Sequence, residues 1–237
     1  MNAVAYFGRG VAEERLNQYQ FAIDDYNDAV RLGMDTVILY YNRGFAYYSL
    51  GQYQAAIDDY SHAIQLNPIA SQLYYTRGLA YNSLGQYQQA VDDFTQTLSL
   101  DPTAIMAYFW RGAAYNAQGN YANAINDLTY LIQTDPNSPD MAIVYATRGR
   151  SHLEVGDNAQ AIDDFTYAIR LSTDQPAYYS ASFYSGRGRA YSASGEYERA
   201  IDDYDRAIEL DPTVAADYFG RGAAYSKLFN LNKRLRI

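Results

Sequence analysis

The residues of this 237-residue chain that could do chemistry are few in kind. Cysteine is absent and histidine occurs only at His62 and His152, which excludes thiolate chemistry, disulfides and most His-based metal sites or triads. Arginine and aspartate, by contrast, form a pattern. An Arg-Gly dipeptide begins at Arg9, Arg43, Arg77, Arg111, Arg148, Arg187 and Arg221. An aspartate follows each of the first six arginines by sixteen residues, at Asp25, Asp59, Asp93, Asp127, Asp164 and Asp203.

The repeated arginine needs a charged partner. It falls within an apolar helical stripe, where an unpaired charge is costly, and its planar fork pairs bidentately with a carboxylate. We therefore predict a structural ladder of Arg–Asp pairs that fixes the stacking register, each arginine meeting the aspartate of its own or of the preceding repeat. The alternative is that these arginines grip a ligand. The predicted ladder residues are Arg43, Asp59, Arg77, Asp93, Arg111 and Asp127.

Nothing else in the sequence resembles a catalytic site. Five of the six aspartates follow another Asp, but neighbours on a helix point about 100° apart and do not converge on one ion. We find no phosphate loop, nucleophile elbow or metal-ligand spacing. His152 stands where other repeats have tyrosine, so we interpret it as a core substitute. We expect no enzyme, no cofactor and no metal.

The spacing of the dipeptides, 34, 34, 34, 37, 39 and 34 residues, indicates a stack of like units. In residues 37–70, Tyr40, Arg43, Gly44 and Tyr47 share one helical stripe. A glycine then breaks the pattern, a second helical stripe follows, and a proline ends it. Each unit is therefore predicted to be two helices, which must stack on neighbouring units to bury a core.

This pattern closely resembles the tetratricopeptide repeat (TPR) family, over nearly the whole chain. In the second repeat the family's motif positions are Tyr40, Arg43, Gly44, Tyr47, Gly51, Tyr53, Ala56, Tyr60, Ala63 and Pro68. The systematic departure is arginine before the first glycine, where the family more often has leucine. The resemblance implies an all-α, right-handed superhelical solenoid of six helix-turn-helix repeats plus a C-terminal capping helix. As one domain over 1–237, its repeats would be 3–36, 37–70, 71–104, 105–141, 142–180, 181–214, a half-repeat 215–229 and a tail 230–237.

The ends and two insertions depart from the period. The first repeat is degenerate, with Glu13 at a tyrosine position and Asn17 at the turn glycine. We interpret the insertions at 135–141 and 172–180 as lengthened loops; the alternative is a change of superhelix pitch, or an extra contact from Tyr178 and Tyr179. The tail is either a solubilising cap or a seed for self-association, through Phe229, Leu231 and Leu235.

The 27 tyrosines fall mostly at repeat positions and are interpreted as core packing, with hydroxyls at the interface edges. A second stripe on each first helix lines, by the family resemblance, a concave peptide-binding groove. It is aromatic in the N-terminal half and locally basic in the C-terminal half. We call its predicted residues the groove residues: Tyr41, Phe45, Tyr48, Tyr75, Leu79, Asn82, Phe109, Asn116, Arg150 and Arg189. Neighbouring positions of the stripe include Ile38, Gln72, Met106, Ser182 and Ser185.

These observations predict a non-catalytic, cytoplasmic scaffold that binds a peptide or helical segment of a protein partner. The family's chaperone-tail clamp is disfavoured because no lysine stands in the groove. The net charge of −9 argues against nucleic acid, and no apolar stretch is long enough to insert in a membrane. The alternative is a structural self-association module, a homo-oligomer formed through the terminal helices.

Overall fold

A computed structural model describes residues 2–172 and 177–234, and within these residues all regular structure is helical, in thirteen helices. The predicted all-α class is thereby confirmed. The chain divides into two compact units, unit 1 up to Gln118 and unit 2 from Gly119. Each unit is described by itself, and the expectation of one continuous domain over 1–237 stays a prediction.

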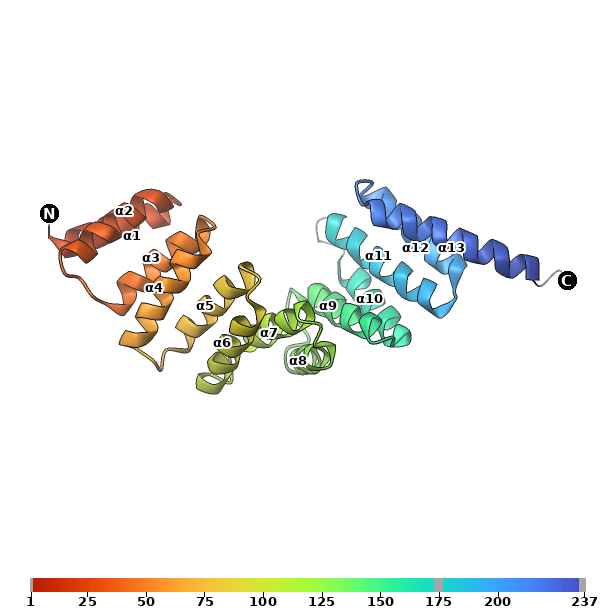
Figure 1. The fold of residues 1–237 in the computed structure, drawn as a ribbon, viewed down its shortest axis with the longest axis horizontal. Coiled ribbons are helices and arrows are strands. Elements are labelled where there is room, and N and C mark those ends of the chain that lie inside the picture. Colours follow the sequence, from red (N-terminus) through yellow and green to blue (C-terminus); the bar gives the residue numbers. More distant parts are fainter. Residues whose placement is uncertain (1, 173–176, 235–237) are drawn as a thin grey trace. The chain divides into compact units, whose positions relative to one another are not determined.

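Unit 1 is a stack of antiparallel helices in which each helix packs on the next along the chain (Figure 1). The first three repeats each contribute a first helix and a second helix, and the last element is a first helix. The helices are α1 (Ala3–Arg15), α2 (Tyr19–Arg31), α3 (Val37–Ser49), α4 (Tyr53–Leu66), α5 (Ser71–Ser83), α6 (Tyr87–Leu100) and α7 (Ile105–Ala117).

Unit 2 begins with a second helix, continues with two complete pairs and ends on a first helix that packs on α12. Its helices are α8 (Tyr121–Thr134), α9 (Met141–Glu154), α10 (Asn158–Leu171), α11 (Ala177–Ser194), α12 (Tyr197–Leu210) and α13 (Ala215–Arg234). Part of the insertion at 172–180 is helical, because α11 begins at Ala177 and gains a turn relative to the first helices that precede it. The side chain of Tyr178 lies outside the described residues. So does Leu235, whereas α13 continues through most of the predicted tail.

The turn between the two helices of a repeat requires a left-handed residue. Gly51 has φ +73°, and the following amides close the turn, with Gly51 N donating to Tyr48 O at 2.9 Å and Gln52 N to Tyr47 O at 2.9 Å. This is the helix C-terminus that glycine favours. In the degenerate first repeat Asn17 takes the same conformation at φ +58°, which asparagine tolerates better than other side chains. The turn therefore survives the loss of its glycine.

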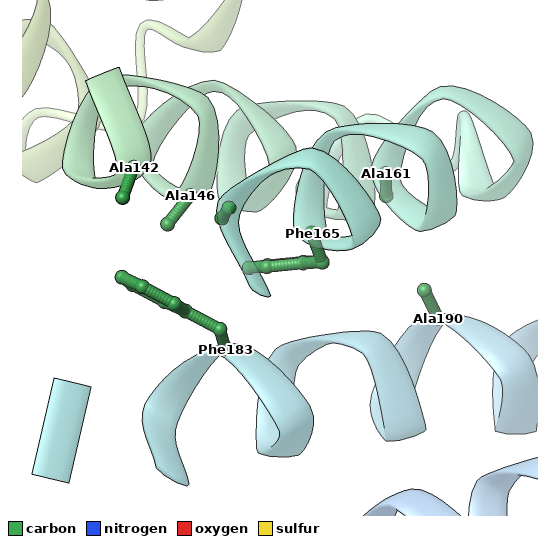
Figure 2. Packing of buried hydrophobic residues seen from close by; sticks show 7 residues of the cluster. Ala142, Ala146, Ala161, Phe165, Phe183 and Ala190 are labelled. Carbon is green, nitrogen blue, oxygen red and sulfur yellow. The ribbon is translucent and has the colours of Figure 1, made fainter. Parts of the chain in front are cut away.

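Small residues let large rings fill the space between helices. In unit 2, Phe165 of α10 and Phe183 of α11 lie in a layer walled by alanines (Figure 2). The alanines are Ala142, Ala146, Ala161 and Ala190. The alternation of ring and methyl group is how close-packed interiors avoid voids. The two phenylalanines are 3% exposed, so each buries nearly its full apolar area, worth about 2–3 kcal/mol.

The glycine of the Arg-Gly dipeptide lies close against the second helix of its repeat at Gly10, Gly44 and Gly78. A Cβ at Gly78 would lie 2.9 Å from Phe94 Cε1, and one at Gly44 would lie 2.8 Å from Tyr60 Cε1. At Gly222 on α13, no atom lies within 4 Å of the corresponding position. The same sequence motif therefore has filled space beside its glycine at Gly44 and Gly78, and open space at Gly222.

We predict opposite effects for two alanine substitutions. Gly78→Ala should lower the free energy of unfolding by about 1–3 kcal/mol, because the methyl group overpacks the contact with the Phe94 ring. Gly222→Ala should raise it by about 0.5–1 kcal/mol, because alanine is the better helix former and the space is free. Urea unfolding followed by circular dichroism measures both. Stabilisation by Gly78→Ala would contradict the close approach.

Candidate functional site

The arginines of the repeat pair with the aspartate of their own repeat. Arg43 donates from Nε to Asp59 Oδ2 at 2.8 Å and from Nη2 to Asp59 Oδ1 at 2.6 Å. Arg77 does the same with Asp93, at 2.8 and 2.7 Å. The same bidentate geometry recurs where Arg9 meets Asp25, Arg148 meets Asp164 and Arg187 meets Asp203. Of the two sequence alternatives, the structure has the pair within a repeat, so the ladder joins first helix to second helix.

The remaining nitrogen of the guanidinium, Nη1, reaches the preceding repeat. Arg43 Nη1 donates to Asn27 Oδ1 at 2.8 Å, and Arg77 Nη1 donates to Ser61 Oγ at 3.0 Å. The acceptor always stands two residues after the aspartate of the preceding repeat, and we call these the acceptor residues: Asn27, Ser61, Thr95, Thr129, Thr166 and Asp205. One arginine therefore ties together three helices from two repeats.

Sequence reasoning missed the acceptor residues. Three of the six are threonine and the other three all differ, so no single residue type marks the position along the whole chain. What they share is a side-chain oxygen at one position, which the repeat alignment would have shown had it been compared by chemical group. Asp205 is the acidic member, and it faces Arg221, whose repeat has no second helix among the described residues.

Two tyrosines of the same helix flank each of Arg43, Arg77 and Arg187. The Arg77 Cζ lies 5.7 Å from the ring centroids of both Tyr74 and Tyr81, and the Arg187 Cζ lies 5.5 and 5.8 Å from those of Tyr184 and Tyr191. These residues are three before and four after the arginine, so the helix repeat alone brings them together. Cation–π attraction adds to the ion pair at such distances.

The tyrosine hydroxyls lie at the edges of the packing and find acceptors there. Tyr26 donates to Glu14 Oε2 at 2.9 Å, and Tyr74 donates to the carbonyl of Pro68 in the preceding loop at 3.1 Å. Tyr218 repeats the second arrangement with Pro212, at 3.3 Å. Rings buried between helices thus keep their polar ends paired, as buried tyrosines require.

The pairs are buried enough for desolvation to matter. The side chains of Arg43 and Asp59 are 15% and 7% exposed. Burial raises the pKa of Asp59 and of Asp93 above the ordinary value, even though a guanidinium lies beside each carboxylate. For the carboxylate, desolvation therefore outweighs the attraction of its partner, whereas the hydrogen bond to Asp93 raises the pKa of Arg77 and so favours its charged form. Buried ion pairs of this kind specify geometry more than they add stability.

Little of each guanidinium is left for a ligand, because protein acceptors take three of its five N–H groups. The ligand-gripping alternative therefore has weak support at these positions. For the predicted pair of Arg111 and Asp127, the first residue belongs to unit 1 and the second to unit 2, and their pairing stays a prediction. Within unit 1, Arg111 donates to Thr95 Oγ1 at 3.1 Å.

We predict strong coupling between Arg77 and Asp93. Replacing either one alone, Arg77→Met or Asp93→Leu, should cost about 3–5 kcal/mol, because it leaves a buried charge unpaired. The double variant should cost far less than the sum of the two, since an apolar pair restores packing without desolvation. Urea unfolding of the four proteins in the double-mutant cycle gives the coupling energy. Strict additivity would show that the pair does not act as a unit.

His152 occupies the place that tyrosine holds in other repeats, on α9 beside Arg148. Its side chain is 13% exposed, and its Nδ1 lies 3.6 Å from Asp157 Oδ2. Burial lowers the pKa of His152 below 6.5, with Arg148 acting in the same direction, against the opposing influence of Asp164 and Asp157. The folded state therefore favours the neutral ring, as a core residue would.

This gives a pH-dependent prediction. Because the folded pKa lies below the unfolded one, the contribution of His152 to stability is present above the unfolded pKa and is lost as pH falls through the folded pKa. The His152→Tyr variant lacks this term. Between pH 7 and pH 5, the wild type should lose more unfolding free energy than His152→Tyr, measured by urea unfolding at each pH. Equal losses would mean that the ring is accessible to protons in the fold.

The stripe that carries the groove residues is hollowed in unit 1. A cavity of about 270 Å³ lies between α5, α6 and α7, and the stripe residues Gln72, Tyr75 and Met106 are among those that line it. Further along the stripe, Ile38 and Phe45 on α3 are 53% and 39% exposed. Apolar area at these positions is therefore available to a partner.

The other groove residues of unit 1 are more engaged with their own fold. Tyr41 lies half-buried, with its ring centroid 6.1 Å from that of Tyr60. Tyr48 is hydrogen-bonded to Ser83 at 3.3 Å across α3 and α5. Leu79 packs against the core cluster around Phe94. The remaining three are half-buried: Asn82 on α5, and Phe109 and Asn116 on α7.

A second cavity, of about 310 Å³, lies in unit 2. Four residues of the predicted stripe line it, Arg150 from α9 and Ser182, Ser185 and Arg189 from α11. Arg189 Nη2 is 3.1 Å from Glu154 Oε1, and its side chain is 54% exposed. The cavity wall also includes the ring of Phe165. The basic groove residues are thus brought together beside apolar surface.

This cavity is less basic than the sequence indicated. Asp217 of α13 also lines it, is 2% exposed, and accepts a hydrogen bond from Ser185. Position 217 corresponds to the apolar positions Leu39 and Leu73 in earlier repeats. The sequence did carry a signal for Asp217, a carboxylate at a position that is apolar in earlier repeats. The groove stripe does not include this position, so the stripe alone could not reveal it.

Antiparallel helix pairs of one repeating sequence, stacked within each unit, define an α-helical repeat protein. Tetratricopeptide repeat models match residues 37–68, 71–104 and 106–138, and a TPR repeat model matches residues 188–228. Together these matches cover more than half of the chain. The chain belongs to the tetratricopeptide repeat family.

Solved structures agree on the fold. A tetratricopeptide repeat protein from Parabacteroides merdae is 25% identical, with a TM-score of 0.62 over 94% of this chain and 84% of that chain. The C-terminal part of a TPR protein from Cytophaga hutchinsonii is 20% identical, with a TM-score of 0.71 over 96% and 95%. YrrB, a TPR protein with an unusual peptide-binding site, is 19% identical, with a TM-score of 0.67 over 83% and 97%. No curated protein sequence matches the chain.

Residues 2–172 and 177–234 contain neither a candidate membrane-spanning helix nor a candidate metal site. No helix in these residues has the combination of length and apolar composition that spanning a lipid bilayer requires. In the same residues, no three side chains of the His, Asp or Glu type gather as a metal ion would require.

Proposed function

We propose that this chain is a scaffold whose groove stripe binds a peptide or helical segment of a partner protein. Family membership supports the broader statement, since TPR repeats are typically non-catalytic modules for protein–protein interaction. The observation that carries the finer proposal is the position of the two cavities. Each is lined by residues of the stripe that the sequence selects, Gln72, Tyr75 and Met106 in one and Arg150, Ser182, Ser185 and Arg189 in the other.

The chemistry of the two cavities differs, so the proposed ligands differ. The cavity beside Tyr75, with the exposed Ile38 and Phe45 on the same stripe, suits an apolar side chain of an extended or helical segment. The cavity between Arg150 and Arg189 suits a segment that places an acidic group beside an apolar one. The net charge of −9 disfavours nucleic acid as the ligand. A cytoplasmic location remains part of the proposal.

We predict that a groove variant loses peptide binding without losing its fold. Peptides selected from a random display library against the wild-type chain should be apolar, and Ile38→Ser/Phe45→Ser should weaken their binding by about tenfold or more, because exposed anchor residues carry most binding energy. Fluorescence anisotropy measures the affinity. Ile69→Ser is the matched control, since Ile69 is 77% exposed in a loop outside the stripe.

The possible outcomes test whether the groove stripe is the binding site. Peptides that bind the groove variant and the control equally well would remove the groove as the binding site. Charge reversal at the other cavity, Arg150→Glu/Arg189→Glu, should weaken acidic peptides in particular, and this loss should shrink in high salt.

The alternative, self-association through the terminal helices, has its support in the exposed Phe219, Phe229 and Leu231 of α13. Light scattering over a range of concentrations distinguishes it, because a strict monomer at high concentration excludes this alternative.

A further inference from the structure

Helix α13 is a first helix without a second helix among the described residues. Its inner face packs on α12, where Ala224 is buried and Leu228 lies against the cluster formed by Ala200, Ile201 and Tyr204 (Figure 1). In the repeats whose two helices lie in one unit, the next face of the first helix is covered by the second helix of the same repeat, as α5 is by α6 and α11 is by α12. On α13 that face carries Tyr218, Gly222 and Tyr225, the two tyrosines 42% and 53% exposed and the glycine with open space above it.

Among the described residues, the arginine on this face has an acceptor for only one of its three nitrogens. Arg221 donates from Nη1 to Asp205, the acceptor residue of the preceding repeat, and stacks on Tyr218 with its Cζ 5.5 Å from the ring centroid. In Arg43, Arg77, Arg148 and Arg187 the Nε and Nη2 groups hold a carboxylate of the second helix. Within residues 2–172 and 177–234, these two donors of Arg221 have no acceptor.

The open face therefore specifies the helix that would fit it. Five of the six second helices among the described residues have an aspartate followed by an aromatic ring, as at Asp59–Tyr60, Asp93–Phe94 and Asp203–Tyr204, whereas α8 has a leucine after its aspartate. An alanine stands three residues before the aspartate, at Ala56, Ala90 and Ala200, and each of these is 0% exposed. The small residue sets the distance between helices, the ring covers the glycine, and the carboxylate meets the guanidinium.

We propose that α13 docks an acidic amphipathic helix of another protein, with the pattern Ala-x-x-Asp-aromatic. This site is separate from the groove stripe, so it is a second interaction surface beyond the proposed function. The bound helix would supply the missing bidentate acceptor to Arg221 and cover Gly222.

Charge favours this occupant over a second copy of the chain. The exposed charged side chains of α13 are basic, including Lys227 and Lys233, the only two lysines of the sequence. The one acid of the helix, Asp217, is buried against Ser185. Two α13 faces brought together would bring no carboxylate to Nε and Nη2 of Arg221, whose Nη1 alone is paired with Asp205. A copy's own Asp-aromatic pairs, for example at Asp59 and Asp203, are already held by Arg43 and Arg187.

The probe is a labelled, acetylated and amidated peptide with the sequence of residues 197–210, which carries the pattern at Ala200, Asp203 and Tyr204. Titrated with the full wild-type chain, it should bind saturably by fluorescence anisotropy. The same peptide with Asp203→Asn should bind about tenfold more weakly, because a hydrogen-bonded charge is lost. Equal binding of both peptides overturns the proposal.

Variants of the chain locate the site. Arg221→Gln should weaken binding about tenfold, and Gly222→Leu should abolish it, because the side chain fills the docking face. Since no atom lies within 4 Å of a Cβ at position 222, Gly222→Leu should fold normally, which circular dichroism checks. Binding that survives Gly222→Leu would place the peptide elsewhere, for example in exchange with α12, and would overturn the proposal.

Two further readouts separate this proposal from the others. Ile38→Ser/Phe45→Ser, the groove variant, should bind the peptide as the wild type does, so failure of the groove proposal does not decide this one. Light scattering of the chain alone should show no dimer that Gly222→Leu dissociates. A dimer that does dissociate in this variant would assign the face to a second copy instead.

Discussion

A guanidinium between packed helices has to find acceptors along its edges, and the structure of this chain is organised around that constraint. The arginine of each Arg-Gly dipeptide lies where TPR proteins more often bury a leucine. Its Nε and Nη2 take the aspartate of the second helix, as Arg77 takes Asp93, and its Nη1 takes the acceptor residue of the preceding repeat, as Arg77 takes Ser61. A leucine would contribute more burial, but it could not distinguish one register from another.

The other recurrent features follow from this arrangement. Glycine after the arginine brings the two helices close enough for the carboxylate to reach, and the ring after the aspartate fills the space over that glycine, as Phe94 does over Gly78. Tyrosines three before and four after the arginine face the same cation. Lysine would not serve in its place, because it is a point charge without a planar fork. The high content of tyrosine and arginine is therefore the composition of one motif repeated along the chain.

The ends show what happens when part of the motif is missing. Arg9, in the first repeat, pairs with its own aspartate, Asp25, and lies 4.0 Å from Glu13, with a side chain 49% exposed. Arg221 has no second helix among the described residues, and the preceding repeat carries Asp205 where the others have a neutral acceptor. The sequence thus balances the charge of the last arginine from the other side.

The fold was predictable because its signals are periodic: the dipeptide spacing, the glycine and the proline mark the helix pairs directly. The groove was predictable only as a stripe, because periodicity selects a helix face but does not give the depth of a side chain. Tyr41 and Leu79 are engaged in packing, whereas Gln72 and Tyr75 line a cavity. The structure was needed to find two kinds of residue. The acceptor residues, such as Asn27 and Ser61, share a position but differ in type, and Asp217 is acidic where earlier repeats have an apolar residue.

The central claim is that each ladder arginine is hydrogen-bonded to two repeats. Nε and Nη2 donate to the aspartate of its own repeat, and Nη1 donates to the acceptor residue of the preceding repeat. Nitrogen-detected or proton-detected NMR of the arginine side chains measures this directly. The account predicts slow rotation about the Nε–Cζ bond, with separate Nη signals and protected Nε protons, for Arg43, Arg77, Arg148 and Arg187. Arg15 and Arg31, on the exposed ends of helices, should show averaged signals. Averaged Nη signals for the four ladder arginines would contradict the account.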